Sequence, residues 1–454
     1  MGTGKTQADR ERLARRSLRY SVYDGAASAA MIGFGESFFT AFAVFLRANN
    51  IQIGLLSALP QALGSALQLA SGRLLALAGS RRALVSSAAL LQALMYLPMA
   101  LAYFAGPMAA NYLIAFACLY WVFGMILGPA WNSWMGDLTS ENERGAYFGR
   151  RSKVVGAFTF GSFLLGGAIL GLQGDGPERE FAGFASIFAL ALIVRVISFL
   201  FLRKMHEPPM ETPAEREAGF VEFLRGARSN NYGLLALYLS LMNFSVYVAV
   251  PFFTPYMLRD LGFDYLTFTL VSAAAVATKV LTLPVWGGAV DRFGSRKVLT
   301  LAGVLMPVVP ALWLFSGGLA WLVAIQLYSG FAWAGFEIAS MGLIFDATEP
   351  SRRASSVAYY NVLNGAAILV GALLGGVLVR YSDLFASRYM VAFLASFVLR
   401  GATSYFFLPR IREVRRVEAI GYPHLFFKIV SSMPTMGPVL GIIPFRPFRR
   451  DRRR

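Results

Sequence analysis

The segment WGGAVDRFGSRKVLTLAG, residues 286–303, places one acid and three bases between two apolar runs. Its charges are Asp291, Arg292, Arg296 and Lys297, all within seven residues. A compact charged turn between long apolar segments is typical of a loop at a membrane surface. The composition of the whole chain tests this interpretation, because a similar turn in a soluble protein would mean something different.

The composition is that of a protein that crosses a membrane many times. Hydrophobic residues make up 56% of the 454 residues, charged residues only 15%, and the mean hydropathy is +0.55. Soluble proteins carry about 25% charged residues, so most of this surface cannot face water. The apolar blocks are about 20 residues long, enough for a helix to cross a hydrocarbon core, and they lack the alternation of a membrane β-barrel. We therefore expect an all-α membrane protein.

Twelve transmembrane helices are expected from these blocks. Their approximate cores are 25–46, 53–72, 83–104, 110–135, 153–173, 182–202, 233–254, 266–290, 298–316, 320–345, 359–379 and 388–408. With the N-terminus inside, 34 of the 42 Lys and Arg residues fall in inner loops and tails, and five fall in outer loops. Because cytoplasmic loops carry the excess of Lys and Arg, both termini are expected in the cytoplasm. The formal charge of +17 therefore indicates orientation rather than nucleic-acid binding.

The chain can be aligned as two copies of one six-helix unit. Residues 137–156 align with 346–365, which places Asp137 over Asp346 and Arg144 over Arg353 at an offset of 209. At that offset LLGG of the fifth helix falls on LLGG of the eleventh, and glycine pairs there allow helix backbones to approach closely. We expect two pseudo-symmetric six-helix bundles. The boundaries are 1–23 for a basic cytoplasmic N-terminus, 24–203 for the first bundle, 204–231 for a cytoplasmic linker, 232–410 for the second bundle and 411–454 for a basic cytoplasmic tail.

The opening segment resembles the loop motif G-x-x-x-D-R-x-G-R-[RK] of the major facilitator superfamily, which lies between helices 2 and 3 and recurs between helices 8 and 9. The matching residues of the second half are Gly287, Asp291, Arg292, Gly294 and Arg296. Those of the first half are Gly72, Gly79, Arg81 and Arg82, with Ala76 where the acid should be. The resemblance covers the twelve helices in order, about residues 20–410, and implies the fold of that superfamily.

The resemblance also implies that these loops take part in conformational switching. In the family the loop acid braces neighbouring helix ends in the outward-open state, which makes Asp291 the candidate brace. The switching loops then include Asp137 and Arg144, with their counterparts Asp346 and Arg353. The alternative is that the charged loops only fix the topology.

Three charged residues inside the predicted helices are candidates for substrate or proton handling. A charge within a bilayer costs several kcal/mol unless it meets a partner or water. Glu36 and Lys279 both lie near the membrane midplane, in helices that border the central cavity in facilitator architecture. We expect Glu36 to carry a proton during transport; the alternative is a fixed ion pair with Lys279. Glu337 of the tenth helix is expected to handle substrate or protons, or else to form structural hydrogen bonds.

The remaining polar residues of the helices are expected either to brace charged groups of the loops or to line a central cavity. Arg195 and Arg400 lie in the peripheral sixth and twelfth helices, where they are expected to reach the inner interface or to brace loop acids such as Asp137 and Asp346. Uncharged polar residues are expected to complete the lining of a central cavity, although each is also a candidate for bonding between helices. These residues are Gln61, Asn132, Asn243, Tyr247, Asn361 and Asn364.

We expect a secondary active transporter that moves a small solute by alternating access and is driven by protons or another coupling ion. The alternative is a related membrane protein that moves or senses lipids. Enzymatic, cofactor and metal chemistry are not expected, since the one cysteine, Cys118, and the two histidines, His206 and His424, form no recognisable centre. The expected partners are the solute, the coupling ion and membrane lipids, without nucleic acid, and the expected form is a monomer in a bacterial inner membrane.

Overall fold

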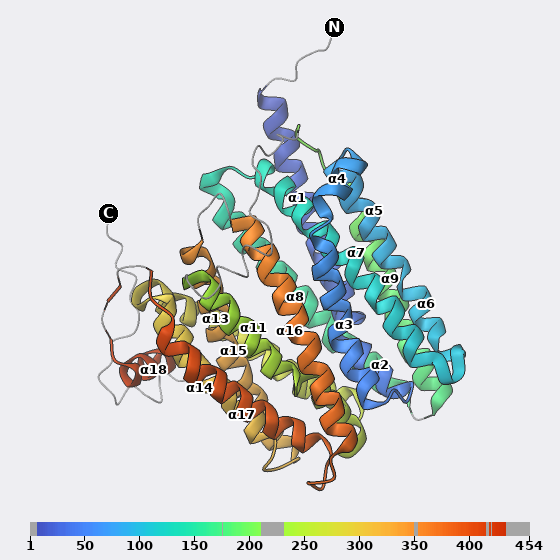
Figure 1. Cartoon of the computed structure of the whole chain (residues 1–454). Coiled ribbons are helices and arrows are strands. Elements are labelled where there is room, and N and C mark those ends of the chain that lie inside the picture. Colours follow the sequence, from blue (N-terminus) through green and yellow to red (C-terminus); the bar gives the residue numbers. More distant parts are fainter. Residues whose placement is uncertain are drawn as a thin grey trace. The chain divides into compact units, whose positions relative to one another are not determined.

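In a computed structural model of the chain, helices are the regular secondary structure of the described residues, which are 7–174, 176–209, 231–348, 353–414, 417–418 and 420–432 (Figure 1). No strand occurs among these residues. The all-α prediction is therefore confirmed.

Ten helical runs of the described chain are long and apolar enough to cross a membrane, or eleven when α3 and α4, bent by 60°, form one span. One of them, Arg81–Leu138, has 58 residues, whereas one crossing needs about 20. Gly106 interrupts that run with φ 56° and ψ −126°, directly before Pro107. A break at this point is consistent with two crossings in the run, and so with the predicted total of twelve.

The helices belong to two compact units. Unit 1 comprises Met1–Arg216, Val250–Leu270 and Ile368–Tyr381, and unit 2 comprises Glu217–Ala249, Val271–Ala367 and Ser382–Arg454. The helices of unit 1 are α1 (Gln7–Phe34), η1 (Glu36–Phe38), α2 (Phe39–Phe45), α3 (Asn50–Gln68), α4 (Ser71–Ala78), α5 (Arg81–Leu94), α6 (Tyr96–Leu101), η2 (Ala102–Met108), α7 (Ala109–Leu138), α8 (Glu141–Leu172), α9 (Pro177–Arg203), α12 (Val250–Pro255) and η3 (Tyr256–Asp260). Those of unit 2 are α11 (Asn231–Tyr247), α14 (Ser295–Leu312), α15 (Leu319–Ala347), α17 (Tyr389–Phe407), η5 (Leu408–Arg410) and α18 (Tyr422–Ser431). Two long helices contribute residues to both units: α13 (Tyr265–Phe293) and α16 (Arg353–Tyr381). The bundle boundaries given above remain a sequence-based prediction.

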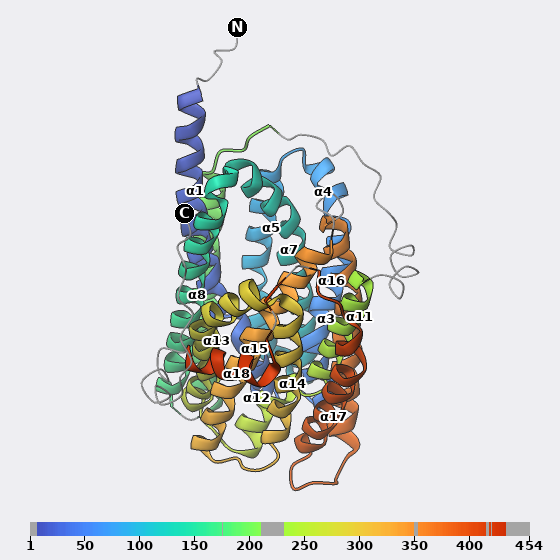
Figure 2. The same ribbon diagram turned by 90° about the vertical axis from the view of Figure 1, so that its left-hand side faces the viewer.

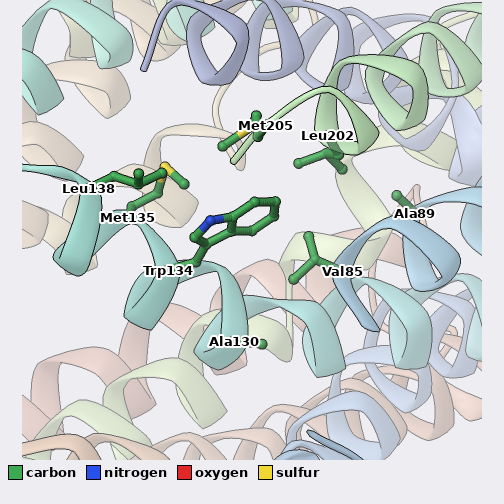
Figure 3. Close-up of a cluster of buried hydrophobic side chains, with 8 residues drawn as sticks. All are labelled: Val85, Ala89, Ala130, Trp134, Met135, Leu138, Leu202 and Met205. Atoms are coloured by element: carbon green, nitrogen blue, oxygen red, sulfur yellow. The ribbon is translucent and has the colours of Figure 1, made fainter. Parts of the chain in front are cut away.

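A buried cluster joins α5, α7 and α9 at one end of unit 1 (Figure 3). Its members are Val85, Ala89, Ala130, Trp134, Met135, Leu138, Leu202 and Met205. Trp134 is fully buried, and its indole N–H donates a 2.9 Å hydrogen bond to the carbonyl of His206. This bond satisfies the one polar group of a large apolar ring, and it fixes the chain just after α9 against α7.

The first helix of unit 1 is longer than its predicted membrane core. It begins at Gln7, so residues 7–23 of the predicted N-terminal segment are helical. It packs along α8 and α9, and its first turns project past the nearby ends of α5 and α7 (Figure 1 and Figure 2). The projecting turns carry several arginines.

The repeated LLGG segments provide close helix contacts inside unit 1. A Cβ atom at Gly167 would lie 2.2 Å from the hydroxyl oxygen of Thr269, and one at Gly376 would lie 3.2 Å from the carbonyl oxygen of Asn50. A larger residue would need the neighbouring segment to move, most clearly at Gly167. Both contacts fit the close approach that the sequence predicted for these glycines.

In unit 2, α14 packs against α15 and α17, and α11 packs against α17. Trp313 at the end of α14 is buried, with its ring 5.9 Å from that of Phe393 in α17. Gly330 lets α15 approach α13, since a Cβ atom there would lie 2.2 Å from the carbonyl oxygen of Ala275. This close approach positions the side chains that α13 and α15 share further along.

Candidate functional site

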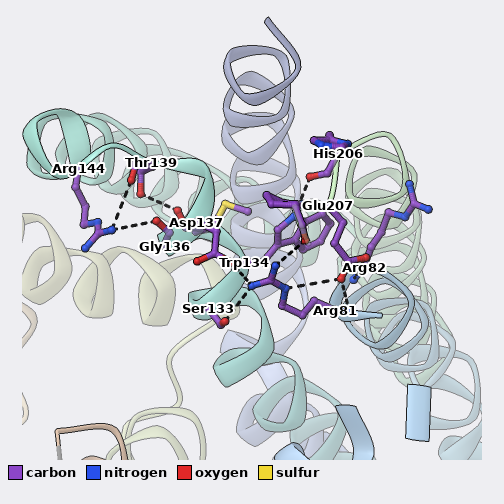
Figure 4. A network of polar contacts seen from close by, with 12 residues as sticks. Arg81, Arg82, Ser133, Trp134, Gly136, Asp137, Thr139, Arg144, His206 and Glu207 are labelled. Atoms are coloured by element: carbon purple, nitrogen blue, oxygen red, sulfur yellow. Dashed lines mark hydrogen bonds and ion pairs between the residues drawn. The ribbon is translucent and has the colours of Figure 1, made fainter. Parts of the chain in front are cut away.

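A polar network at one end of unit 1 surrounds the buried guanidinium of Arg81 (Figure 4). Its side chain is 1% exposed. It donates hydrogen bonds to the Asp137 carboxylate at 2.6 Å, the Ser133 hydroxyl at 3.1 Å and the Pro208 carbonyl at 3.0 Å. We call Arg81, Ser133, Asp137, Glu207 and Pro208 the first clasp. It ties the start of α5 to the end of α7 and to the segment after α9.

Glu207 connects the first clasp to the backbone at the start of α5. Its carboxylate accepts hydrogen bonds from the backbone amides of Arg81 at 2.6 Å and Arg82 at 3.3 Å. The first amides of a helix have no partners within the helix, and the helix dipole favours a negative charge there. Ser80 completes the arrangement, because its hydroxyl accepts from the amide of Ala83 at 3.1 Å. The sequence interpretation missed Glu207, which lies 126 residues from Arg81.

The motif glycines of the first half have different roles. Gly79 ends α4 in the left-handed region, with φ 63°, where glycine has no steric cost. Gly72 has open space around its Cβ position, so no close contact explains it.

Unit 2 has a corresponding contact at the start of α14. The Glu413 carboxylate, which follows α17 and η5, accepts a hydrogen bond from the backbone amide of Arg296 at 2.9 Å. Gly294 precedes α14 with φ 89°, and a Cβ atom there would lie 2.3 Å from a Glu413 carboxylate oxygen. Glycine is thus required both by the backbone and by the acid beside it. We call Gly294, Arg296 and Glu413 the second clasp.

The remaining bases of this loop bind the chain that follows α17. Arg292 forms a 2.7 Å ion pair with Glu418, and Lys297 donates to the Glu418 carbonyl at 3.1 Å. Lys428 of α18 lies 5.0 Å from the ring centre of Phe293. Partial burial and the neighbouring Arg292 lower the pKa of Lys428, while Glu418 raises it.

Asp291, the candidate brace, is exposed, and it forms no hydrogen bond or ion pair within the described ranges. Gly287 has open space at its Cβ position. Asp346 is half-buried at the end of α15, and the side chain of Arg353 lies outside the described residues. A bracing role for Asp291 therefore stays a prediction.

Arg144 stabilises the end of α7. Its guanidinium donates to the carbonyl oxygens of Gly136 at 3.0 Å and Thr139 at 3.5 Å. The last carbonyls of a helix have no helical partner, and a cation there complements the helix dipole.

The prediction that Arg195 braces Asp137 is wrong. Asp137 is bound by Arg81, whereas Arg195 is 4% exposed in α9 and donates to the hydroxyl of Ser198 at 2.9 Å. Ser198 in turn donates to the carboxylate of Asp24 at 2.6 Å. Arg195 is held among buried groups of α1 and α9, because a buried charge needs polar partners close by.

Asp24 is the buried acid of this second network in unit 1, and it was missed from the sequence. It is 3% exposed, and the guanidinium of Arg151 lies 3.6 Å from its carboxylate. Arg151 also donates to the carbonyl of Ser21 at 3.2 Å and stacks over the ring of Trp131 at 4.3 Å. Asp24 directly precedes the predicted first membrane core, which begins at residue 25. An acid at such a position is typical of the solvent-exposed end of a helix.

Arg400 of α17 is 1% exposed, and its guanidinium donates hydrogen bonds to backbone carbonyls rather than to a carboxylate. It donates to the carbonyl oxygens of Met306 at 3.2 Å and Val246 at 3.5 Å, and no acid partners it within the described part of unit 2. Its guanidinium joins α17 to α14 and α11.

Glu36 lies where the first membrane-spanning segment of unit 1 is interrupted. The helix α1 ends at Phe34, and Glu36 begins the short helix η1. Its carboxylate accepts a 2.9 Å hydrogen bond from the phenol of Tyr120 in α7. Gly35 makes room for a second phenol, since a Cβ atom there would lie 2.3 Å from the hydroxyl oxygen of Tyr96. The two tyrosines were missed because a tyrosine inside an apolar helix usually indicates packing.

Lys279 and Glu337 form an ion pair in unit 2. The ammonium of Lys279 in α13 donates to the carboxylate of Glu337 in α15 at 3.0 Å, and the side chains are 36% and 53% exposed. Among the predicted lining residues of the same unit, the Asn243 amide donates to the Asn364 carbonyl oxygen at 2.7 Å. Unit 2 therefore brings together four of the predicted residues as two pairs.

The other predicted lining residues differ in exposure. Gln61, Tyr247 and Asn361 are half-buried, and Asn132 is exposed on α7.

Comparison with known proteins gives a consistent picture of the family. A family model described as Major Facilitator Superfamily matches residues 25–255 and 235–452. The curated "Multi-drug resistance efflux pump PmrA" of Streptococcus pneumoniae is 24% identical over 220 residues, which cover 44% of this chain and 54% of the pump. The chain therefore spans about half the length of this curated relative.

Solved structures show the same fold at low sequence identity. A mutant of the nucleoside transporter NupG has a TM-score of 0.68 at 14% identity, covering 88% of this chain and 100% of NupG. A D-xylose-proton symporter has a TM-score of 0.69 at 13% identity, covering 89% of this chain and 99% of the symporter.

Proposed function

The chain belongs to the major facilitator superfamily, and we propose that it is a proton-coupled secondary active transporter of a small organic solute. It works by alternating access in the cytoplasmic membrane of a bacterium, as a monomer with both termini in the cytoplasm. Its membership makes it an integral membrane transporter rather than an enzyme. The curated relatives are named efflux pumps, which supports export of the solute in exchange for protons.

The observation that carries this proposal is the partly exposed ion pair between Lys279 and Glu337. Glu337 lies ten residues before the end of α15, about 15 Å along the helix axis. Charges at such depth are tolerated only when they face a partner, the bundle interior or a water-filled cavity. A pair that remains 36% and 53% exposed supports a water-accessible hollow, in which the pair and the amides of Asn243 and Asn364 contact the solute.

Glu36 is the proposed proton carrier. It is half-buried at a helix break, and its carboxylate binds a phenol rather than a base among the described residues. A carboxyl without a fixed cation gains and loses a proton without breaking a salt bridge. In unit 2, Tyr247 and Asn361 complete the proposed lining, and in unit 1 Gln61 and Asn132 are the proposed polar contacts for solute or protons. The segments that contain Gly72 in α4, Gly79 at the end of α4 and Gly287 in α13 carry the conformational change.

Replacing Glu36 tests the proposal. Everted membrane vesicles with an imposed pH gradient are assayed for accumulation of ethidium and of solutes that raise the melting temperature of the purified protein. Glu36→Gln should abolish gradient-driven accumulation and retain solute exchange, because exchange requires no proton release. The matched control is Glu178→Gln, since Glu178 is exposed at the start of α9. Normal accumulation by Glu36→Gln would refute the assignment.

A further inference from the structure

Four arginines form a line on the projecting part of α1. Arg12, Arg15, Arg16 and Arg19 are all exposed, and their spacing places them on one face of the helix. We call these residues the arginine stripe. It runs from residue 12 to residue 19, about 10 Å along the axis.

The arginine stripe has no acidic partner within the described chain. Among the described residues, the side-chain hydrogen bonds of its members run from Arg16 to the phenol of Tyr20, at 3.1 and 3.0 Å. Like charges three and four residues apart destabilise a helix. An external anion would remove that repulsion.

Aromatic rings next to the arginine stripe are of the kind that collects at the level of the lipid headgroups. Tyr20 and Tyr23 each contact the ring of Phe201 in α9, with centroid distances of 6.1 and 5.4 Å. Lys204, at the end of α9, lies 6.0 Å from the same ring. Tyrosines collect where the hydrocarbon core meets the headgroups, so the arginines just before them fall in the headgroup layer.

The arginine stripe and the two tyrosines also flank an open groove on α1. Its volume is about 410 Å³, and its lining residues, the four arginines, Tyr20 and Tyr23, all belong to this one helix, so the groove is open to the outside. Its walls combine guanidinium groups, which match phosphate oxygens in pairs, with ring faces that suit glycerol and the first methylenes of acyl chains.

We propose that the arginine stripe is a binding site for anionic phospholipid of the cytoplasmic leaflet, with preference for a headgroup that carries two phosphates. Four guanidinium groups over about 10 Å can engage two phosphates at once. The site rests on the predicted cytoplasmic position of the N-terminus and does not depend on which solute is transported.

The test measures lipid binding by the purified full chain in neutral detergent. Cardiolipin, phosphatidylglycerol and phosphatidylcholine are titrated at equal phosphate concentration, and binding is followed by native mass spectrometry. The variant Arg15→Gln/Arg19→Gln should bind cardiolipin about thirty-fold more weakly, if each basic residue contributes about 1 kcal/mol. The control Arg150→Gln/Lys153→Gln removes two exposed charges from α8 and should bind as the native protein does.

The outcomes are distinguishable from each other and from failure of the transport proposal, because no transport is measured. Equal losses in the two double variants, or equal binding of phosphatidylcholine, would overturn the proposal. If inorganic pyrophosphate competed at concentrations equal to the lipid phosphate, the stripe would be a site for a soluble anion, and the lipid assignment would be overturned.

A second variant keeps the positive charge, because basic residues before a first span also direct membrane insertion. This variant is Arg15→Lys/Arg19→Lys. It keeps the charge and should still bind several-fold more weakly, since an ammonium cannot form paired bonds to phosphate; unchanged affinity would contradict the proposal.

Discussion

The carboxylate of Glu207 accepts a 2.6 Å hydrogen bond from the backbone amide of Arg81, although the two residues are 126 positions apart. In unit 2 the carboxylate of Glu413 accepts a 2.9 Å hydrogen bond from the backbone amide of Arg296, which is 117 positions away in the sequence. Each acid follows a long helix, α9 or α17, and each amide lies in the first turn of another, α5 or α14. The two units therefore close the same junction by the same means, which is what a duplicated six-helix unit predicts.

Removing the acids should destabilise the two units to different degrees. Glu207→Ala should lower the free energy of unfolding by about 2 to 3 kcal/mol, because it leaves two amides without a cap beside the buried Arg81. Glu413→Ala should cost about 1 kcal/mol, since only one amide at the start of α14, that of Arg296, loses its cap. Thermal unfolding of the purified variants in detergent measures both.

Glu418→Ala is the control for this series. It removes the ion pair with Arg292, whose side chains are 42% and 57% exposed, and exposed pairs contribute about 0 to 1 kcal/mol. If Glu418→Ala were as damaging as Glu207→Ala, charge loss rather than helix capping would explain the result.

The geometry of Arg81 predicts that lysine cannot replace it. One guanidinium serves Asp137, Ser133 and the Pro208 carbonyl in three directions, and an ammonium on a flexible stem does not hold these acceptors together. Arg81→Lys should lower the melting temperature by several degrees, equivalent to about 1 to 2 kcal/mol. Arg82→Lys is the matched control, because the side chain of Arg82 is exposed. Equal melting temperatures for the two variants would show that only the charge at position 81 matters.

The glycines and bases of the loops were predictable from the sequence, whereas their acidic partners were not. A repeated motif places Gly79 and Gly294 at turns, and both adopt a positive φ. Glu207 and Glu413 lie outside the motif, and only the folded chain brings them to the helix ends. The sequence instead indicated Asp291, which is exposed. A local pattern therefore identified where the chain turns but not which distant group closes the turn.

The same limit applies to charges inside the helices. Depth along the chain singled out Glu36, Lys279 and Glu337, because a charge within an apolar run stands out. Depth does not give the direction of a side chain, so the sequence offered Glu36 as the ion-pair partner of Lys279, whereas the structure pairs Lys279 with Glu337. Asp24 escaped notice at the edge of a predicted helix, because the helix in fact begins at Gln7.

The two buried arginines should respond differently to replacement by methionine. Arg195→Met removes the charge that faces the buried Asp24 network through Ser198, and breaking a buried charge network costs about 3 kcal/mol. Arg400→Met leaves no buried acid behind among the described residues and fills a similar volume, so stability should change by less than about 1 kcal/mol. Thermal unfolding of both variants tests this, and a larger loss for Arg400→Met would reverse the ranking.

The ion pair of Lys279 and Glu337 should show measurable coupling in a double-mutant cycle. The single variants Lys279→Met and Glu337→Gln each leave an unpaired polar partner partway along a membrane-spanning helix, while the double variant removes the charges together. We expect a coupling energy of about 1 kcal/mol, modest because both side chains are partly exposed and screened by water. Thermal unfolding of the four proteins gives the coupling energy, and vesicle accumulation of the same solutes gives the functional counterpart. If stability is additive while both single variants lose accumulation, the two residues act on the solute separately and the pair is not a structural unit.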